Sequence, residues 1–169
     1  MAELLAHKAV ELDKVKVARR RVLSQPGYLD QNYLAQPKYD GCLGVADMQI
    51  RSMRTRTDEM IHSCDHVLQD LEAMEFNGMV VFGELWKPHT EQSKISGDVR
   101  RHKPAPDLNF VIFDCVTSEE FDVGYTRIPY VERMDYVWER FNRAVRVPTF
   151  SRSICVPTLH YNQGTYGKH

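Results

Sequence analysis

The stretch Met79-Val-Val-Phe-Gly-Glu-Leu-Trp86 and the later stretch Phe110-Val-Ile-Phe-Asp-Cys-Val116 are short apolar runs rich in β-branched and aromatic residues. Runs of this length and composition are typical of buried strands, because helices usually need about ten residues or more. Residues 87–109, which lie between them, are polar, basic and interrupted by prolines. We therefore expect two buried strands joined by a long loop.

Helical patterns flank these strands in the sequence. Upstream, Thr57 is a candidate N-cap, and apolar residues at helical spacing predict an amphipathic helix over 58–74. Downstream, Pro129 precedes a second segment with one apolar face, which predicts another helix. Residues 34–56 alternate and are broken by glycines, which favours a strand and a hairpin, and one or two strands fit after Pro148. The pattern indicates a mixed α+β chain with one composite core.

The composition excludes several classes of protein. A chain of 169 residues with 43% hydrophobic and 27% charged residues is one domain or part of one, and is not largely disordered. The net charge of −1 gives no global argument for binding a polyanion. No apolar run approaches the roughly 18–20 residues of a membrane helix, and the N-terminus lacks a secretory pattern. We expect a cytoplasmic protein with no membrane partner.

Metal and disulfide chemistry have weak support. The 4 cysteines are scattered without a C-x-x-C pair, which indicates reduced, mostly buried thiols rather than a zinc knuckle or a disulfide framework. His62 and His66 have the i, i+4 spacing that can bind a metal on one helix face. They lack the glutamate of an H-E-x-x-H motif, so solvated helix histidines are the favoured interpretation.

The segment Gln36-Pro-Lys38-Tyr-Asp40-Gly41 carries the most chemistry. On an extended backbone, Lys38 and Asp40 share one side. A glycine lets the main chain come close to a ligand. A lysine beside a carboxylate can serve as a nucleophile when its pKa is lowered, but a surface hairpin with a salt bridge fits the same residues.

The pieces that follow in order favour the first interpretation. Lys38-Tyr-Asp-Gly41 resembles the lysine motif of the covalent nucleotidyltransferases, most closely that of small phage-type ATP-dependent DNA ligases. The remaining pieces resemble the arginine motif, the glutamate motif and the aromatic strand of these ligases, followed by two connecting segments: Thr55-Arg56-Thr57, Phe82-Gly-Glu84-Leu-Trp86, Phe110-Val-Ile-Phe113-Asp114, Ile95–Arg101 and Arg127–Arg133.

The resemblance implies a fold and a domain arrangement. It predicts an ATP-grasp-like nucleotidyltransferase (adenylation) domain of antiparallel sheets with flanking helices over residues 24–169, after an N-terminal helical segment over 1–23. No E-G-x-x-x-K stretch and no later K-x-K strand follow Phe113. We therefore expect the first half of an adenylation domain, incomplete and without the oligonucleotide-binding (OB) domain. A second chain carrying the missing motifs is a candidate partner.

The resemblance also implies site roles. Lys38 would attack the α-phosphorus of ATP to give lysyl-AMP, with Mg²⁺ on the phosphates and with Asp40 orienting the metal or an incoming hydroxyl. In nucleotide binding, Gln36 would contact the adenine edge, Arg56 (or its competitor Arg54) the ribose or phosphate, Glu84 the ribose hydroxyls, and Phe113 the adenine face. Glu84 is also a candidate metal ligand. Nicked duplex DNA would receive the AMP, with Arg100, Arg101 and Lys103 as candidate backbone contacts.

Two departures from the family pattern keep alternatives open. Leu43 stands where the lysine motif usually has an arginine, which leaves ATP affinity and nick recognition in question. Phe82 stands where the glutamate motif usually has an aspartate, a version also found in RNA ligases. The alternatives are therefore an RNA ligase of the same superfamily, or a catalytically incomplete fragment that binds only nucleotide, DNA or a partner chain.

Overall fold

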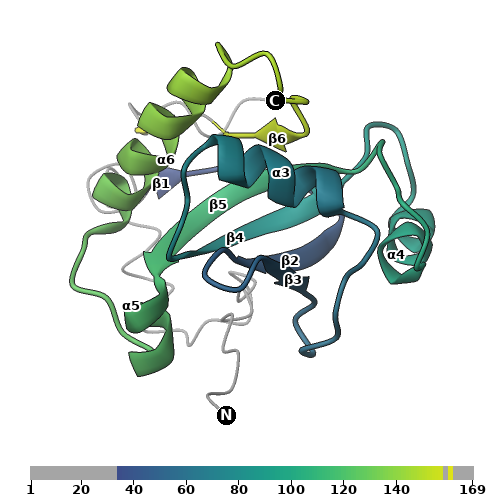
Figure 1. The fold of residues 1–169 in the computed structure, drawn as a ribbon, viewed down its shortest axis with the longest axis horizontal. Helices are drawn as coiled ribbons and strands as arrows, with labels where there is room; N and C mark the ends of the chain where they lie inside the picture. The colour runs from purple at the N-terminus through teal and green to yellow at the C-terminus, as the bar shows by residue number, and fades with distance from the viewer. Residues whose placement is uncertain (1–33, 158–159, 162–169) are drawn as a thin grey trace, which may run out of the picture. The chain divides into compact units, whose positions relative to one another are not determined.

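The computed structural model describes residues 34–157 and 160–161 (Figure 1). The predicted helical segment over 1–23 lies outside the described residues, so its boundary stays a prediction. The chain divides into two compact units, and the described part of the larger one runs from Tyr39 to Val156. In the other unit, β1 (Leu34–Ala35) pairs antiparallel with β7 (His160–Tyr161).

The larger unit is built on a sheet with the strand order β3-β2-β4-β5-β6. The strands are β2 (Cys42–Asp47), β3 (Ser52–Arg54), β4 (Met79–Trp86), β5 (Asn109–Thr117) and β6 (Ile154–Cys155). Both apolar runs are strands, as predicted, and they pair with each other. Neighbours are antiparallel except β5 and β6, which are parallel. The predicted antiparallel pairing holds from β3 to β5, and β6 adds a parallel edge because α5 and α6 carry the chain back between β5 and β6.

Four helices are described around this sheet: α3 (Asp65–Ala73), α4 (Gln92–Arg100), α5 (Ser118–Val123) and α6 (Tyr130–Ala144). In Figure 1, α3 lies across one face of the sheet. The helix predicted after Pro129 is α6. No helix of the described residues is long and apolar enough to cross a bilayer.

The helix predicted over 58–74 is wrong in its first part, because α3 begins only at Asp65. Asp58 has a φ of 65°, outside the helical region, and its carboxylate pairs with Arg54 at 2.8 Å. Thr57 therefore lies in a turn that follows β3 and caps no helix. Backbone hydrogen bonds from Thr55 N–H to the Glu59 carbonyl and from Ile61 N–H to the Met53 carbonyl hold this segment in a turn, despite the helical spacing of its apolar residues.

The loop predicted over 87–109 is also wrong in part, because it contains α4. Ile95 and Val99 are fully buried at i, i+4 spacing, so the segment has a short apolar stripe. Pro88, Pro104 and Pro106 lie outside the helix. The prolines therefore mark the ends of a short helix rather than its absence.

A cross-strand pair of glycines leaves room for a large core side chain at the centre of the sheet. Gly44 of β2 faces Gly83 of β4, and a Cβ on Gly83 would come within 2.6 Å of the Phe110 ring. The ring therefore occupies the space that two side chains would need. Phe110 and Leu85 are fully buried on this face.

Candidate functional site

The glutamate of β4 is bonded to the glycine that follows the candidate nucleophile segment. The backbone N–H of Gly41 donates to Glu84 Oε1 at 3.0 Å, across 43 positions of sequence. A Cβ on Gly41 would come within 2.2 Å of the Leu85 carbonyl oxygen. The close approach that the sequence assigned to a ligand is therefore made by β4 itself, and a glycine is required there for steric reasons.

The segment before Gly41 alternates in exposure as expected for an extended chain. Lys38 and Asp40 are exposed, and Tyr39 is half-buried. The Tyr39 ring makes an edge-to-face contact with Trp86 at a centroid distance of 5.2 Å. This contact and the Gly41–Glu84 hydrogen bond fasten Tyr39 and Gly41 to the end of β4. Gln36 and Lys38 belong to the other unit, where Gln36 is half-buried.

Leu43, the departure from the family pattern, pairs directly with Glu84 across the β2–β4 ladder. Side chains of directly paired residues lie on the same face of a sheet and are neighbours. An arginine at position 43 would therefore lie beside the Glu84 carboxylate. With leucine at position 43, Glu84 has an apolar neighbour there instead.

Phe113 lies at a β-bulge close to Glu84. Phe82 pairs with Asp114 and Gly83 pairs with Ile112, so Phe113 is the extra residue of β5. Glu84 pairs with Val111, which is two positions before Phe113 in the same strand. Residues two apart in a strand face the same side, so the structure brings Glu84 and Phe113 to one face of the sheet. Phe113 is partly exposed there.

The candidate arginines are placed differently from one another. Arg54 is engaged with Asp58, whereas Arg56 is exposed in the turn that follows. Arg100, Arg101 and Lys103 are all exposed at the end of α4 and just beyond it. The Arg101 guanidinium is held by Asp98 at 2.9 Å and by the Pro104 carbonyl at 3.0 Å.

A charged cluster that the sequence did not single out lies just beyond β4. Lys87 has an 11% exposed side chain and donates to Asp98 of α4 and to Asp107. Burial alone would lower the pKa of the Lys87 amine, but its hydrogen bonds to Asp107 and Asp98 raise that pKa above its usual value. The cluster holds α4 against the end of the strand that carries Glu84. The only signal for this cluster in the sequence was a lysine directly after an apolar strand.

Metal and thiol chemistry find little support in the part of the chain that the structure describes. No three His, Cys, Asp or Glu side chains come together there as a metal site. His66 bonds to the Leu108 carbonyl, and His62 stacks on His102. All four cysteines are free thiols. Burial raises the pKa of Cys64 to about 11 and that of Cys115 to about 12, so both thiols are neutral near pH 7.

Sequence comparisons find no family model and no curated protein that matches this chain. Structure comparisons find similar folds. A structure of Pmar-Lig aligns with a TM-score of 0.60 at 18% identity, over 75% of this chain and 30% of its own. The ATP-dependent DNA ligase from bacteriophage T7, in complex with ATP, aligns with a TM-score of 0.58 at 14% identity, over 77% of this chain and 49% of its own. The Chlorella virus DNA ligase-adenylate aligns with a TM-score of 0.52 at 17% identity, over 75% and 43%.

These similarities confirm the predicted fold class. The larger unit has the mixed α+β fold of the ligase adenylation domain, with an open sheet of five strands and flanking helices. The chain spans less than half the length of each of these ligase structures. The roles assigned to individual site residues stay predictions.

Proposed function

We propose that this chain is the nucleotidyltransferase part of an ATP-dependent DNA ligase and that Lys38 is its nucleophile. The observation that carries the proposal is the hydrogen bond from Gly41 N–H to Glu84 Oε1. It ties together two of the motifs that the sequence shares with the ligases, within a fold that the ligase structures share. Lys38 precedes Gly41 by three positions in the chain.

The proposed reaction is a substitution at the α-phosphorus of ATP. The neutral Lys38 amine forms an N–P bond, the bond from the α-phosphorus to the bridging oxygen breaks, and pyrophosphate leaves with that electron pair. The amine loses a proton to solvent or to a nearby base. The product is a lysyl-AMP phosphoramidate.

The nucleotide would bind on the face that carries Glu84 and Phe113. A partly exposed ring beside a carboxylate suits a purine nucleoside, because the ring offers a stacking surface and the carboxylate accepts hydrogen bonds from ribose hydroxyls. Gln36 would contact the adenine edge, and Arg56 the ribose or a phosphate. Asp40 would orient the metal or the incoming hydroxyl.

Mg²⁺ is proposed only as the cation that accompanies ATP. The described residues hold no cluster of metal ligands, and Glu84 Oε1 already accepts a hydrogen bond from Gly41. Mg²⁺ often binds through one or two carboxylates together with substrate phosphates, where it neutralises charge. Glu84 and Asp40 are the carboxylates available for this among the predicted site residues.

Nicked duplex DNA is the proposed acceptor. The AMP would pass to a 5′-phosphate at the nick, and the neighbouring 3′-hydroxyl would displace it to seal the strand. Arg100 and Lys103, exposed near the end of α4, are proposed to contact the DNA backbone. A second chain carrying the later ligase motifs is the proposed partner for sealing.

The first step is tested with α-labelled ATP and Mg²⁺, followed by denaturing electrophoresis. The native chain should give a covalent labelled band, Lys38→Ala should give none, and the control Lys94→Ala, at an exposed lysine of α4, should label normally. A band that survives in Lys38→Ala would overturn the assignment of the nucleophile. If the folded native chain binds ATP without becoming labelled, the result would support the alternative of a catalytically incomplete fragment that only binds nucleotide.

The acceptor is tested by adding nicked duplexes to labelled protein. DNA ligase activity predicts transfer of AMP to an all-DNA nick and sealing after a chain with the later motifs is added. Preferential sealing of nicks with RNA strands would favour the RNA ligase, the alternative motivated by Phe82-Gly-Glu84. No gain from the added chain would sink the proposal of a partner.

A further inference from the structure

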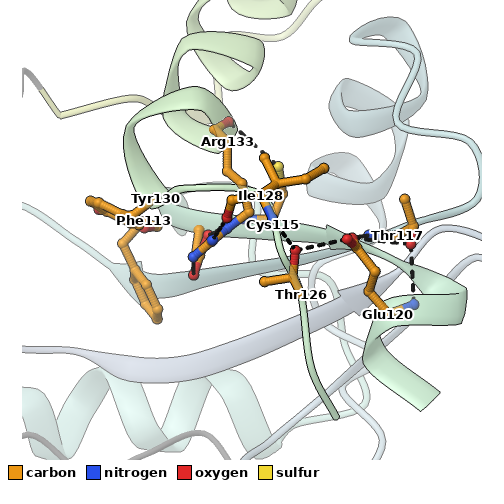
Figure 2. Close-up of polar contacts among 9 residues, drawn as sticks. Phe113, Cys115, Thr117, Glu120, Thr126, Ile128, Tyr130 and Arg133 are labelled. Atoms are coloured by element: carbon orange, nitrogen blue, oxygen red, sulfur yellow. Dashed lines mark hydrogen bonds and ion pairs between the residues drawn. The ribbon is translucent and has the colours of Figure 1, made fainter. Parts of the chain in front are cut away.

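The first turn of α6 contacts three consecutive residues of β5, at the bulge that carries Phe113 (Figure 2). Tyr130 Oη donates to the Phe113 carbonyl at 2.9 Å. Arg133 donates from Nε and Nη2 to the two carboxylate oxygens of Asp114, at 2.7 and 2.8 Å. Cys115 Sγ lies 3.7 Å from the Arg133 carbonyl. In Figure 2 the Phe113 ring extends away from α6, while Arg133 reaches the strand from the helix side.

The Arg133–Asp114 pair is less exposed than an ordinary surface ion pair, and it is joined by two hydrogen bonds rather than one. Its side chains are 14% and 25% exposed, and the guanidinium meets the carboxylate in a two-pronged arrangement. Arg133 Nη1 also donates to the Ile128 carbonyl, and Asp114 Oδ1 also accepts from Cys115 N–H. The hydrogen bond to Asp114 raises the pKa of Arg133, so the guanidinium stays charged.

The segment between β5 and α6 is itself anchored. Thr117 and Glu120 form a reciprocal capping box at the start of α5, and Thr126 Oγ1 donates to Glu120 Oε1 at 2.7 Å. Ile128 N–H in turn donates to Thr126 Oγ1. These bonds connect the end of β5 to the start of α6, as Figure 2 shows. The first turn of α6 is therefore fixed relative to the strand that it contacts.

A bulge interrupts the hydrogen-bond ladder and lets the strand bend, so its shape depends on partners outside the ladder. Tyr130 and Arg133 supply such partners to the residue that bulges and to the next one. We propose that Tyr130 and Arg133 are positioning residues, which hold the bulge so that the Phe113 ring is presented to the purine of ATP. This inference rests on the proposed function, because it takes the purine site from there.

The test measures binding of α,β-methylene-ATP by equilibrium dialysis, since its α–β bridge cannot be cleaved and binding is separated from chemistry. Phe113→Ala should weaken binding about tenfold, within the range found for stacked bases. Arg133→Met and Tyr130→Phe should each weaken it about three- to tenfold. In chains that already carry Phe113→Ala, the same two changes should weaken it less than about twofold, because the ring that they position is gone.

Arg140→Met is the matched control on the same helix. Its side chain is 20% exposed, but it donates to the carbonyls of Met74 and Glu75 and to the Glu75 carboxylate rather than to β5. Binding should change by less than about twofold. Tyr130→Phe removes one hydroxyl, so it keeps the test informative if Arg133→Met fails to fold.

Equal losses with and without Phe113 would overturn the inference, since they indicate a general structural effect. No binding of the analogue by folded native chain would overturn it together with the purine site. Binding of the analogue without a covalent band from ATP would contradict the proposed reaction alone and leave the positioning role intact.

Discussion

Two contacts fasten candidate site residues to their neighbours, and they do so by opposite means. At Gly41 the backbone lies against the Leu85 carbonyl, and the contact depends on the absence of a side chain. At Asp114 the contact is made by long side chains that reach from α6 to β5. The first is a steric requirement that one methyl group would violate, whereas the second is a set of polar bonds that can be removed one at a time.

The largest loss of stability is expected at Gly41, where a side chain has no space. Gly41→Ala places a Cβ 2.2 Å from a backbone oxygen, so β4 or the segment before β2 must shift. We expect a loss of about 3 kcal/mol in the free energy of unfolding, and loss of lysyl-AMP formation because the Gly41–Glu84 bond is displaced. Urea denaturation and the labelling assay measure the two effects.

Gly97→Ala is the matched control for that change. Gly97 lies inside α4, and a Cβ there would meet no atom within 4 Å. The same substitution should therefore stabilise the chain by about 0.5–1 kcal/mol, since alanine favours helices over glycine. Native-like stability of Gly41→Ala would contradict the steric interpretation.

A smaller effect is expected at the side-chain contact. Arg133→Met leaves the partly buried Asp114 carboxylate without its main partner, which should lower the free energy of unfolding by about 2 kcal/mol. Adding Asp114→Asn should recover part of that loss, because the uncompensated charge is removed. No recovery in the double variant would indicate that Arg133 stabilises the chain through packing instead.

The exposed Arg143–Glu139 pair on the same helix calibrates this prediction. Its side chains are 61% and 60% exposed. Arg143→Met should change the free energy of unfolding by less than about 0.5 kcal/mol, as is usual for exposed pairs. Equal losses at Arg133 and Arg143 would remove the distinction between the two pairs.

The same contrast explains what the sequence could predict. The strands β4 and β5 and the helix α6 have strong local patterns, and all three were predicted. The Gly41–Glu84 bond joins residues 43 positions apart and depends on the β2–β4 register, which no local pattern contains. The bulge at Phe113 is hidden for the same reason, because no glycine or proline marks it within the run from Phe110 to Val116.

The wrong predictions have local causes that the sequence partly showed. The Thr117–Glu120 capping box and Gly124, which has a φ of 73° at the end of α5, were readable signals for a helix that was not predicted. In the segment expected to be a loop, the i, i+4 spacing of Ile95 and Val99 was a signal for the helix α4. The turn before α3 was harder to predict, because Asp58 takes a positive φ, which residues other than glycine rarely adopt.

The smallest effect concerns the pH dependence of the Glu120 hydrogen bonds, which anchor the segment between β5 and α6. The hydrogen bond from Thr126, together with the Thr117 N–H, holds the pKa of Glu120 below its ordinary value of 4.5. A carboxylate with a lowered folded pKa adds stability above its unfolded pKa, and that stability is lost as the pH falls through the folded pKa. Glu120→Gln should therefore lower Tm by about 2 °C near pH 7, and this difference should shrink below pH 4.5. Glu119→Gln, at the exposed neighbour in the same turn, should give no such pH-dependent difference. Thermal melts between about pH 7 and pH 3 measure both variants, and a deficit in Glu120→Gln that stays constant with pH would show that Glu120 acts through shape rather than charge.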